Sequence, residues 1–256
     1  MRRGFSVVVS CEHAGNIVPD DFTTLFRGRQ RMLHSHRGYD AGALELAVLI
    51  AGRFQTLPYT SAVTRLLVDL NRSSGNPRRF SEISRRLATV ERECVMGSYY
   101  WPYRREVESR VACLCGEGRS VFHLSVHTFT PVLNGKIRSA DIGLLYDPSR
   151  RQESLFCSRW KSKMAGGNHI LKVRFNYPYS GRSDGLTTHL RSLFGDEVYL
   201  GIELEVNQKY VRGRRTAWRK IQRALVESLA AVLEAYKVPD NWTSSAKPPQ
   251  ASRGHR

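Results

Sequence analysis

The chain has 256 residues, of which 41% are hydrophobic and 25% are charged, and its formal net charge is +17. This length predicts one large α/β domain with a buried core, and no run approaches the ~20 apolar residues that a membrane-spanning helix needs. The five cysteines are odd in number and irregularly spaced, which argues against a disulfide framework and favours a reducing, cytoplasmic location.

The predicted elements alternate between strands and helices. An apolar, β-branched run over residues 5–11 is typical of a buried strand. Further strands are predicted over 62–70, 121–126, 139–147, 170–175 and 197–206, and residues 176–188 form a loop. Helices are predicted over 41–54, 153–164 and 214–236, with a helical stretch over 81–111 that breaks near 98–102.

This alternation predicts an α/β fold in which helices sandwich a mixed, largely parallel sheet. We expect one domain over residues 1–237. Residues 238–256 are rich in proline, serine and lysine, and a disordered basic tail is predicted there.

Two histidines follow apolar strand-like runs that lie far apart in the sequence. His13 comes close after residues 5–11, and His127 directly after residues 121–126. Ligands of open α/β sheets bind outside the carboxyl ends of the strands, and catalytic zinc sites combine histidine nitrogens with a carboxylate and an open position. The pair therefore indicates a metal site, although a lone histidine at a strand end is more often a hydrogen-bonded structural residue. The polar groups placed to add a third ligand are Asp40, Glu12 and Asn16.

A second polar group closes the predicted strand over 62–70. Strand alternation puts Asp69 and Asn71 on the same side. The neighbouring Arg72 can clamp a carboxylate with two parallel hydrogen bonds, which lysine does less specifically. Arg65 and Arg138 are further cationic candidates. The group predicts a site for a substrate carboxylate, and the alternative is a salt bridge at the end of the strand.

The predicted strand over 197–206 carries Glu203 and Glu205 on one face and apolar residues on the other. Acidic residues are rare inside strands, so the pair predicts a function: one of them would be the general base that takes a proton from water. The alternative is an edge strand whose acidic face meets solvent. The loop over 176–188, with Tyr179, Ser180 and the nearby His189, is placed to cover such a site.

Together these motifs make the sequence resemble the N-formylglutamate amidohydrolase family. The matching blocks occur in the family's order and cover residues of about 5 to 235. They are Cys-Glu-His-Ala-Gly-Asn-Ile-Val-Pro (11–19), Gly-Tyr-Asp-Ala-Gly-Ala (38–43), Thr-Arg-Leu-Leu-Val-Asp-Leu-Asn-Arg (64–72), His-Thr-Phe-Thr-Pro-Val-Leu-Asn-Gly (127–135), Arg-Ser-Ala-Asp-Ile-Gly-Leu-Leu-Tyr-Asp (138–147), Asn-Tyr-Pro-Tyr-Ser-Gly (176–181) and Glu-Val-Asn-Gln-Lys-Tyr-Val (205–211).

The resemblance implies a fold like that of the zinc-dependent exopeptidases and hydrolysis of a small anionic N-acyl amino acid such as N-formylglutamate. It implies Zn²⁺, or another divalent metal, held by His13 and His127, with Asp40 favoured over Glu12 as third ligand. Glu205 is favoured as the catalytic base, with Glu203 second. The side chains expected to bind substrate are Arg65, Asp69, Asn71, Arg72, Arg138, Asn176, Tyr179, Ser180 and His189.

Two positions depart from the pattern. Distant relatives, the aspartoacylase and succinylglutamate desuccinylase group, carry a ligating glutamate in His-x-x-Glu where this chain has Asn16, which leaves the third ligand open. The family commonly reads Glu-Ile-Arg-Asn-Asp around the last strand, and here Asn207 replaces the arginine. A changed substrate contact is predicted there.

The net charge supports an alternative function. Pairs of arginines are scattered along the chain, and such a surface suits an anionic partner. A catalytically altered family member that binds a polyanion would lose affinity steeply with added salt. No recognisable nucleic-acid motif accompanies the charge, however, so we expect neither a nucleic-acid nor a membrane partner, and hydrolysis remains the favoured function.

Overall fold

A computed structural model describes residues 5–165 and 171–236 of the chain. The predicted tail over 238–256 and the first residue of the strand predicted over 170–175 lie outside these residues. Among the helices within the described ranges, none combines the length and the apolarity that crossing a membrane requires.

The centre of the fold is a six-stranded sheet in the order β2-β1-β3-β8-β6-β7. All neighbouring strands run parallel except β6 and β8, which are antiparallel. The predicted mixed, largely parallel sheet is therefore confirmed. The strands are β1 (Ser6–Cys11), β2 (Tyr59–Thr60), β3 (Val121–Phe129), β6 (Ile142–Leu145), β7 (Val173–Phe175) and β8 (Tyr199–Asn207).

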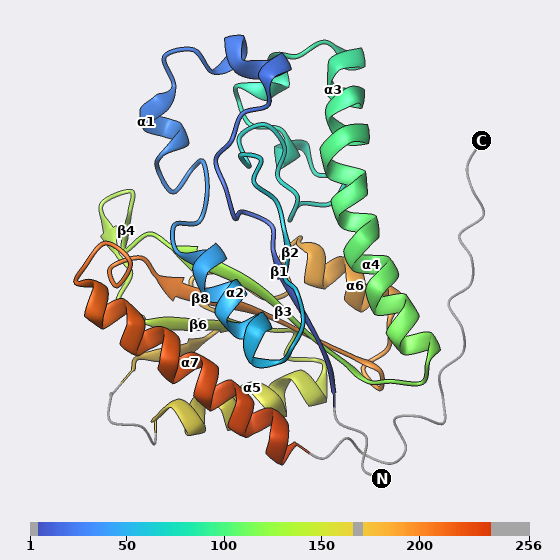
Figure 1. The fold of residues 1–256 in the computed structure, drawn as a ribbon, viewed down its shortest axis with the longest axis vertical. Helices are drawn as coiled ribbons and strands as arrows, with labels where there is room; N and C mark the ends of the chain where they lie inside the picture. Colours follow the sequence, from blue (N-terminus) through green and yellow to red (C-terminus); the bar gives the residue numbers. More distant parts are fainter. Residues whose placement is uncertain (1–4, 166–170, 237–256) are drawn as a thin grey trace.

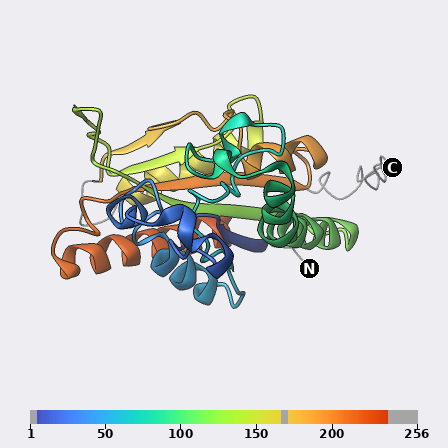
Figure 2. The ribbon, with the colours of Figure 1, turned by 90° about the horizontal axis from the view of Figure 1, so that it is seen from above.

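Helices cover both faces of this sheet (Figures 1 and 2). One layer holds α2 (Ala43–Arg53), α5 (Arg151–Ala165) and α7 (Arg215–Ala235), which pack on the larger apolar core. The other holds α4 (Trp101–Gly116) and α6 (Leu186–Leu193). Shorter elements complete the fold: η1 (Asp20–Phe26), α1 (Gln30–Leu33), η2 (Pro77–Arg79), η3 (Ser84–Arg86), α3 (Thr89–Val95) and the hairpin of β4 (Val132–Leu133) and β5 (Lys136–Ile137).

The two central strands explain where the polar side chains go. Every residue of β3 and β8 is buried. Because side chains alternate across a strand, one face carries apolar residues such as Leu124 and Leu204, which belong to the core under α2, α5 and α7. The opposite face carries the polar residues, with His127 beside Glu205 and Ser125 beside Glu203 in the register of the two strands. The alternative of a solvent-facing edge strand for the two glutamates is therefore wrong.

The strand predicted over 62–70 is not formed. Only Val63 makes an isolated bridge, with Ile17, and the chain turns where Leu67 N donates to Thr64 O and Arg72 N to Asp69 O. Leu66, Leu67, Val68 and Leu70 are nonetheless buried in the second core. A short, continuous apolar run reports burial but not secondary structure, which is why the pattern misled.

The helical stretch predicted over 81–111 also differs from the structure. The α-helix begins only at Thr89, after the single turn η3. There is no break near 98–102, because a π-helical turn over Met96–Tyr100 joins α3 to α4, and the two form one long rod (Figure 1). Pro102 lies in the first turn of α4, directly after the π-helical turn, and has no N–H to donate to that turn.

Gly143 of β6 allows the closest backbone approach near the site. A β-carbon there would lie 1.8 Å from Tyr177 O and 3.2 Å from Glu205 Cβ. We expect Gly143→Ala to lower the free energy of unfolding by about 1–3 kcal/mol or more, since backbone must move to relieve the overlap. Gly52→Ala in α2 is the matched control: its β-carbon meets nothing within 4 Å, and the helical position favours alanine by up to ~1 kcal/mol. Denaturant titration of both variants measures the difference, and equal stabilities would contradict the expectation.

Candidate active site

A cavity of about 190 Å³ opens over the polar face of β3 and β8. Most residues predicted for the site line it, although they come from segments spread over the whole chain. These residues are His13, Asp40, Arg65, Asn71, Arg72, His127, Arg138, Tyr179, Ser180, Glu203 and Glu205.

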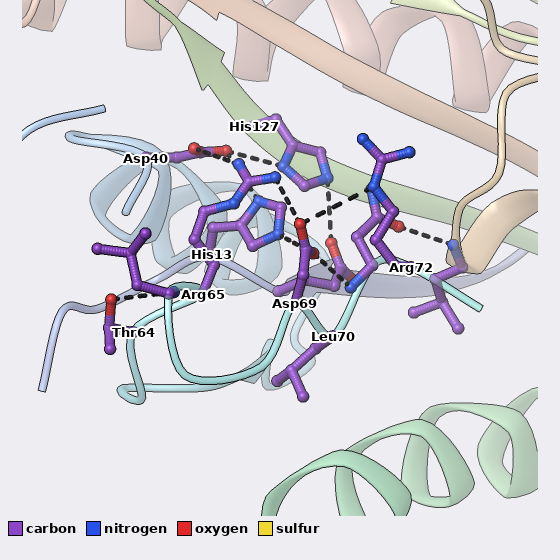
Figure 3. Close-up of polar contacts among 12 residues, drawn as sticks. His13, Asp40, Thr64, Arg65, Asp69, Leu70, Arg72 and His127 are labelled. Atoms are coloured by element: carbon purple, nitrogen blue, oxygen red, sulfur yellow. Dashed lines mark hydrogen bonds and ion pairs between the residues drawn. The ribbon is translucent and has the colours of Figure 1, made fainter. Parts of the chain in front are cut away.

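Three buried side chains converge at the cavity. His13 follows β1, His127 lies on β3, and Asp40 immediately precedes α2, tied to the first segment by a hydrogen bond from Asp40 N to His13 O. Asp40 Oδ2 lies 3.3 Å from His13 Nδ1 and 2.9 Å from His127 Nδ1 (Figure 3). A ligand atom from each of the three lies within 4.8 Å of the others, so the cluster could hold a metal ion.

The outer nitrogen of each imidazole also faces a carboxylate. His13 Nε2 lies 2.7 Å from Asp69 Oδ1. His127 Nε2 lies 3.1 Å from Glu12 Oε2 and 2.9 Å from Ser125 Oγ. Metal-bound histidines commonly donate their second ring N–H to a carboxylate, which fixes the tautomer and the ring orientation. The arrangement therefore directs Nδ1 of both rings toward Asp40.

Glu12 is held by further hydrogen bonds. The Tyr103 hydroxyl donates to Glu12 Oε1 at 3.1 Å, and the Ser125 hydroxyl donates to Oε2 at 2.7 Å. The carboxylate thus contacts the ring of His127 at the nitrogen opposite to the one that faces Asp40. Asn16, the other alternative for a third ligand, donates to Leu33 O instead. Of the three alternatives, Asp40 joins the two histidines.

The charges of the cluster are strongly coupled. Burial alone would raise the pKa of Asp40, but His13 and His127 hold it well below its usual value. Burial likewise opposes the ionisation of Glu12, and hydrogen bonds and charge from His127 lower its pKa. Burial would lower the pKa of His127, but Asp40 and Glu12 raise it well above its usual value. A bound cation would compete with a proton for these side chains. The donor set of two imidazoles and one carboxylate fits a divalent cation.

We expect Glu12→Gln to weaken metal binding by about 10- to 100-fold, because the amide removes the charge that holds the outer N–H of His127. Equilibrium dialysis against zinc measures the affinity directly. Glu93→Gln, on the exposed side of α3, is the matched control and should bind like the wild type. An unchanged affinity in Glu12→Gln would show that this carboxylate does not support the cluster.

The arginines of the cavity differ in how far their charge is neutralised. Arg65 donates to Asp69 Oδ2 at 2.7 Å and to Asp40 Oδ1 at 3.5 Å. Arg72 lies 4.0 Å from Asp69 and donates to Asp184 O. Arg138 donates to the Tyr179 hydroxyl, and among the described residues no carboxylate pairs with it. Arg72 and Arg138 are therefore the cations best placed for an anionic ligand.

Two glutamates form the acidic wall of the cavity. Glu205 is buried, its Oε2 has no hydrogen-bond partner among the described residues, and burial raises its pKa to about 8. Glu203 accepts a hydrogen bond from the Thr187 hydroxyl at 2.5 Å. A buried carboxyl with a raised pKa that faces a cavity is a common feature of functional sites.

Several predicted residues do not line the cavity. Asp69 lies behind His13, as described above. The side-chain oxygen of Asn176 accepts from Tyr146 N and Gly181 N, so this residue shapes its loop. His189 lies on α6 and pairs with Glu108 at 2.8 Å. Asn207 is buried, and its amide donates to the carbonyl oxygens of Arg138 and Ala140, so it supports the segment that carries Arg138.

Sequence reasoning did not assign several residues of the site, among them the cavity residues His36 and Asp184 and the supporting residues Ser125 and Tyr103, which hold Glu12. His36 and Asp184 lie in irregular segments, where no periodicity marks a side chain as inward-facing. Ser125 shares the strand face of His127 two residues away, a signal that alternation could have revealed.

Comparisons with known proteins identify the family of the chain. The sequence model of the N-formylglutamate amidohydrolase family matches residues 5–212. None of the curated proteins in the comparison matches the chain.

Two solved structures share the fold. One is a gene product from Agrobacterium tumefaciens, with a TM-score of 0.75 and 27% identity, over 91% of this chain and 92% of that one. Another is an N-formylglutamate amidohydrolase from Ralstonia eutropha, with a TM-score of 0.64 and 18% identity, over 91% and 94% of the two chains. With the family match over most of the described residues, these findings establish that the chain belongs to the N-formylglutamate amidohydrolase family.

Proposed function

We propose that this amidohydrolase is metal-dependent and cleaves the amide bond of a small anionic N-acyl amino acid, with N-formylglutamate as the first substrate to test. The observation that carries the proposal is the His13–Asp40–His127 cluster in one cavity with an unpartnered, buried carboxyl of Glu205. The family membership supports the amide as the bond that is cleaved.

His13, Asp40 and His127 would hold the cation, and Zn²⁺ is the natural candidate for two imidazoles and one carboxylate. When bound, the cation would supply Lewis acidity, which lowers the pKa of water and polarises the amide carbonyl. Asp69 and Glu12 keep the two imidazoles oriented through their outer nitrogens.

Glu205 acts as the base in this proposal. Its Oε2 takes a proton from the attacking water and then delivers it to the leaving nitrogen, which is the usual double role of a carboxylate in hydrolysis. The side-chain oxygen of Asn71 accepts from Leu186 N at 2.7 Å. No described residue accepts from its amide N–H groups, which can donate to the oxygen that becomes negative in the transition state.

The cationic side of the cavity would select the substrate. Arg72 and Arg138 bind the carboxylates of the N-acyl amino acid, because their guanidinium groups are the least neutralised in the cavity. Tyr179 and Ser180 lie beside them on the loop before α6.

Chelation is the experiment that tests the proposal. We expect the purified protein to release formate from N-formyl-L-glutamate, to lose that activity on removal of metal by EDTA and dialysis, and to recover it when about one equivalent of Zn²⁺ is returned. A formate assay on the same sample before, between and after these steps gives the result. Full activity in protein shown by elemental analysis to be metal-free would contradict the metal dependence.

The polyanion-binding alternative rests on the net charge. Part of that charge serves the fold: Arg104 and Arg150 donate to backbone carbonyl oxygens, and Arg191 pairs with the buried Glu153. The exposed arginines remain, so retention on a heparin column at moderate salt would support the alternative. Hydrolysis is favoured because a polyanion-binding surface has no need of a buried acidic wall beside His13 and His127.

A further inference from the structure

Glu203 has no task in the hydrolytic scheme, and its surroundings are unusual for a buried acid. It is only 9% exposed and lines the cavity beside Glu205. Among the described residues, no lysine, arginine or histidine nitrogen lies within 4.0 Å of the Glu203 carboxylate. Buried carboxylates are ordinarily paired with a cation. Glu203 thus faces a ligand cavity with no cation at ion-pair distance; Arg191 acts on it only from farther away and is itself paired with Glu153.

The position of this carboxylate is fixed from the side of α6. The Thr187 hydroxyl donates to Glu203 Oε1, and a β-carbon on Gly185, which precedes α6, would lie 3.0 Å from the same oxygen. Glycine therefore lets the start of α6 approach closely. Since Oε1 accepts from Thr187 and no described residue forms a hydrogen bond to Oε2, Oε2 is the acceptor available to a ligand in the cavity.

Acidic and basic side chains thus lie on different sides of the cavity. Glu203 and Glu205 lie on the β8 side, and Arg72 and Arg138 supply positive charge elsewhere around the same space. A ligand that complements both sides carries an anion and a cation. The substrate of the proposed reaction carries only carboxylates, but one of its products is an amino acid, which is a zwitterion.

The reaction itself creates that cation. Hydrolysis breaks the bond between the acyl carbon and the amide nitrogen and forms a bond from the acyl carbon to the water oxygen. The nitrogen keeps its own hydrogen and receives both protons of the water, so the products are a carboxylate and an ammonium, with no net change in charge. A carboxylate beside the leaving nitrogen is complementary to this product and to the transition state that precedes it.

We propose that Glu203 receives the newly formed ammonium of the amino acid product, while Glu205 handles the proton. This inference rests on the proposed function, because it requires an N-acyl amino acid as substrate. Glu203 is then a product-binding residue that discriminates an α-ammonium from the neutral amide. It makes the enzyme sensitive to inhibition by free α-amino acids.

Two ligands that differ only at the α-carbon test the assignment. L-glutamate and glutarate have the same pair of carboxylates, and glutarate lacks the ammonium. We expect calorimetric titration of the zinc-loaded protein to show that L-glutamate binds roughly tenfold or more tightly than glutarate. In Glu203→Gln, whose amide oxygen can still accept from Thr187, this preference should disappear while the affinity for glutarate stays unchanged. Glu227→Gln, on the exposed surface of α7, should retain the preference.

Three outcomes would overturn the inference: no preference for L-glutamate in the wild type, a preference that survives in Glu203→Gln, or an equal loss of affinity for both ligands in that variant.

A further comparison uses only the wild-type protein and therefore still tests the inference if the variant does not fold. L-2-hydroxyglutarate, which has a neutral hydroxyl in place of the ammonium, should bind no better than glutarate. Release of formate from N-formyl-L-glutamate by the same sample separates this inference from the proposed function, since activity without the preference refutes only the role of Glu203.

Discussion

Replacing His127 by alanine is expected to remove both the metal and the activity. The imidazole lies between Asp40 and Glu12, at 2.9 and 3.1 Å, so its loss takes one proposed ligand and leaves two buried carboxylates without their shared partner. We expect bound zinc to fall from about one per chain to a small fraction, and kcat/KM to fall by roughly 10³-fold or more. Elemental analysis and the formate assay on one preparation measure both effects.

The effect of this variant must be separated from loss of the fold. His34→Ala is the matched control, because His34 is exposed just after α1 and its Nδ1 forms a hydrogen bond with Gln30 O, away from the cavity residues. It should keep both metal and activity. His13→Ala should behave like His127→Ala, since the two rings contact the same oxygen of Asp40. A folded His127→Ala protein that hydrolyses the substrate at the wild-type rate would remove His127 from the site.

Replacing Glu205 by glutamine should separate catalysis from metal binding. The amide has the size of the carboxyl but cannot accept and return a proton, so kcat should fall by about 10²- to 10⁴-fold. The His13–Asp40–His127 cluster stays intact, and metal content should remain that of the wild type. Glu117→Gln at the end of α4, where the side chain is exposed, is the control. Wild-type kcat in Glu205→Gln would assign the base to another group.

The raised pKa of Glu205 predicts that the stability of the metal-free protein depends on pH, and the Glu205→Gln variant provides the reference. Burial raises the pKa of Glu205 from 4.5 to about 8, so between these values the folded state keeps a proton that the unfolded state has released. The folded state is then penalised as pH rises through this window, and wild-type stability should fall relative to Glu205→Gln by at most ~1.4 kcal/mol per pH unit. Urea titrations of both proteins across the window measure the slope, and parallel profiles would contradict the raised pKa.

Local sequence patterns were sufficient for the framework of the fold and for most of the site. The apolar runs around β1, β3 and β8 predicted the central strands, and strand alternation placed Glu203 and Glu205 on one face. His13 and His127 were found because residues near the carboxyl ends of parallel strands meet at one edge of a sheet. These features are local and periodic, so a single sequence carries them.

The failures occurred where burial does not depend on a regular element. The apolar residues of 62–70 fill the second core, and the backbone there turns so that Asp69 reaches His13 and Arg65 reaches Asp69. The π-helical turn after α3 and the short helix α6 were missed for a related reason: tertiary packing stabilises them more than intrinsic propensity does.

The sequence by itself determined the central strands β1, β3 and β8, the amphipathic helix α7 and the chemical types of the side chains at the strand ends. Only the tertiary structure decided that Asp40 joins the two histidines while Glu12 holds the far side of His127, and that Glu203 faces the cavity with no cation of the described residues at ion-pair distance. The physical reason is that pairing of charges and hydrogen bonds depends on distances of a few ångströms between segments far apart in the chain. Local pattern fixes which face a side chain takes, but packing alone fixes which partner it meets there.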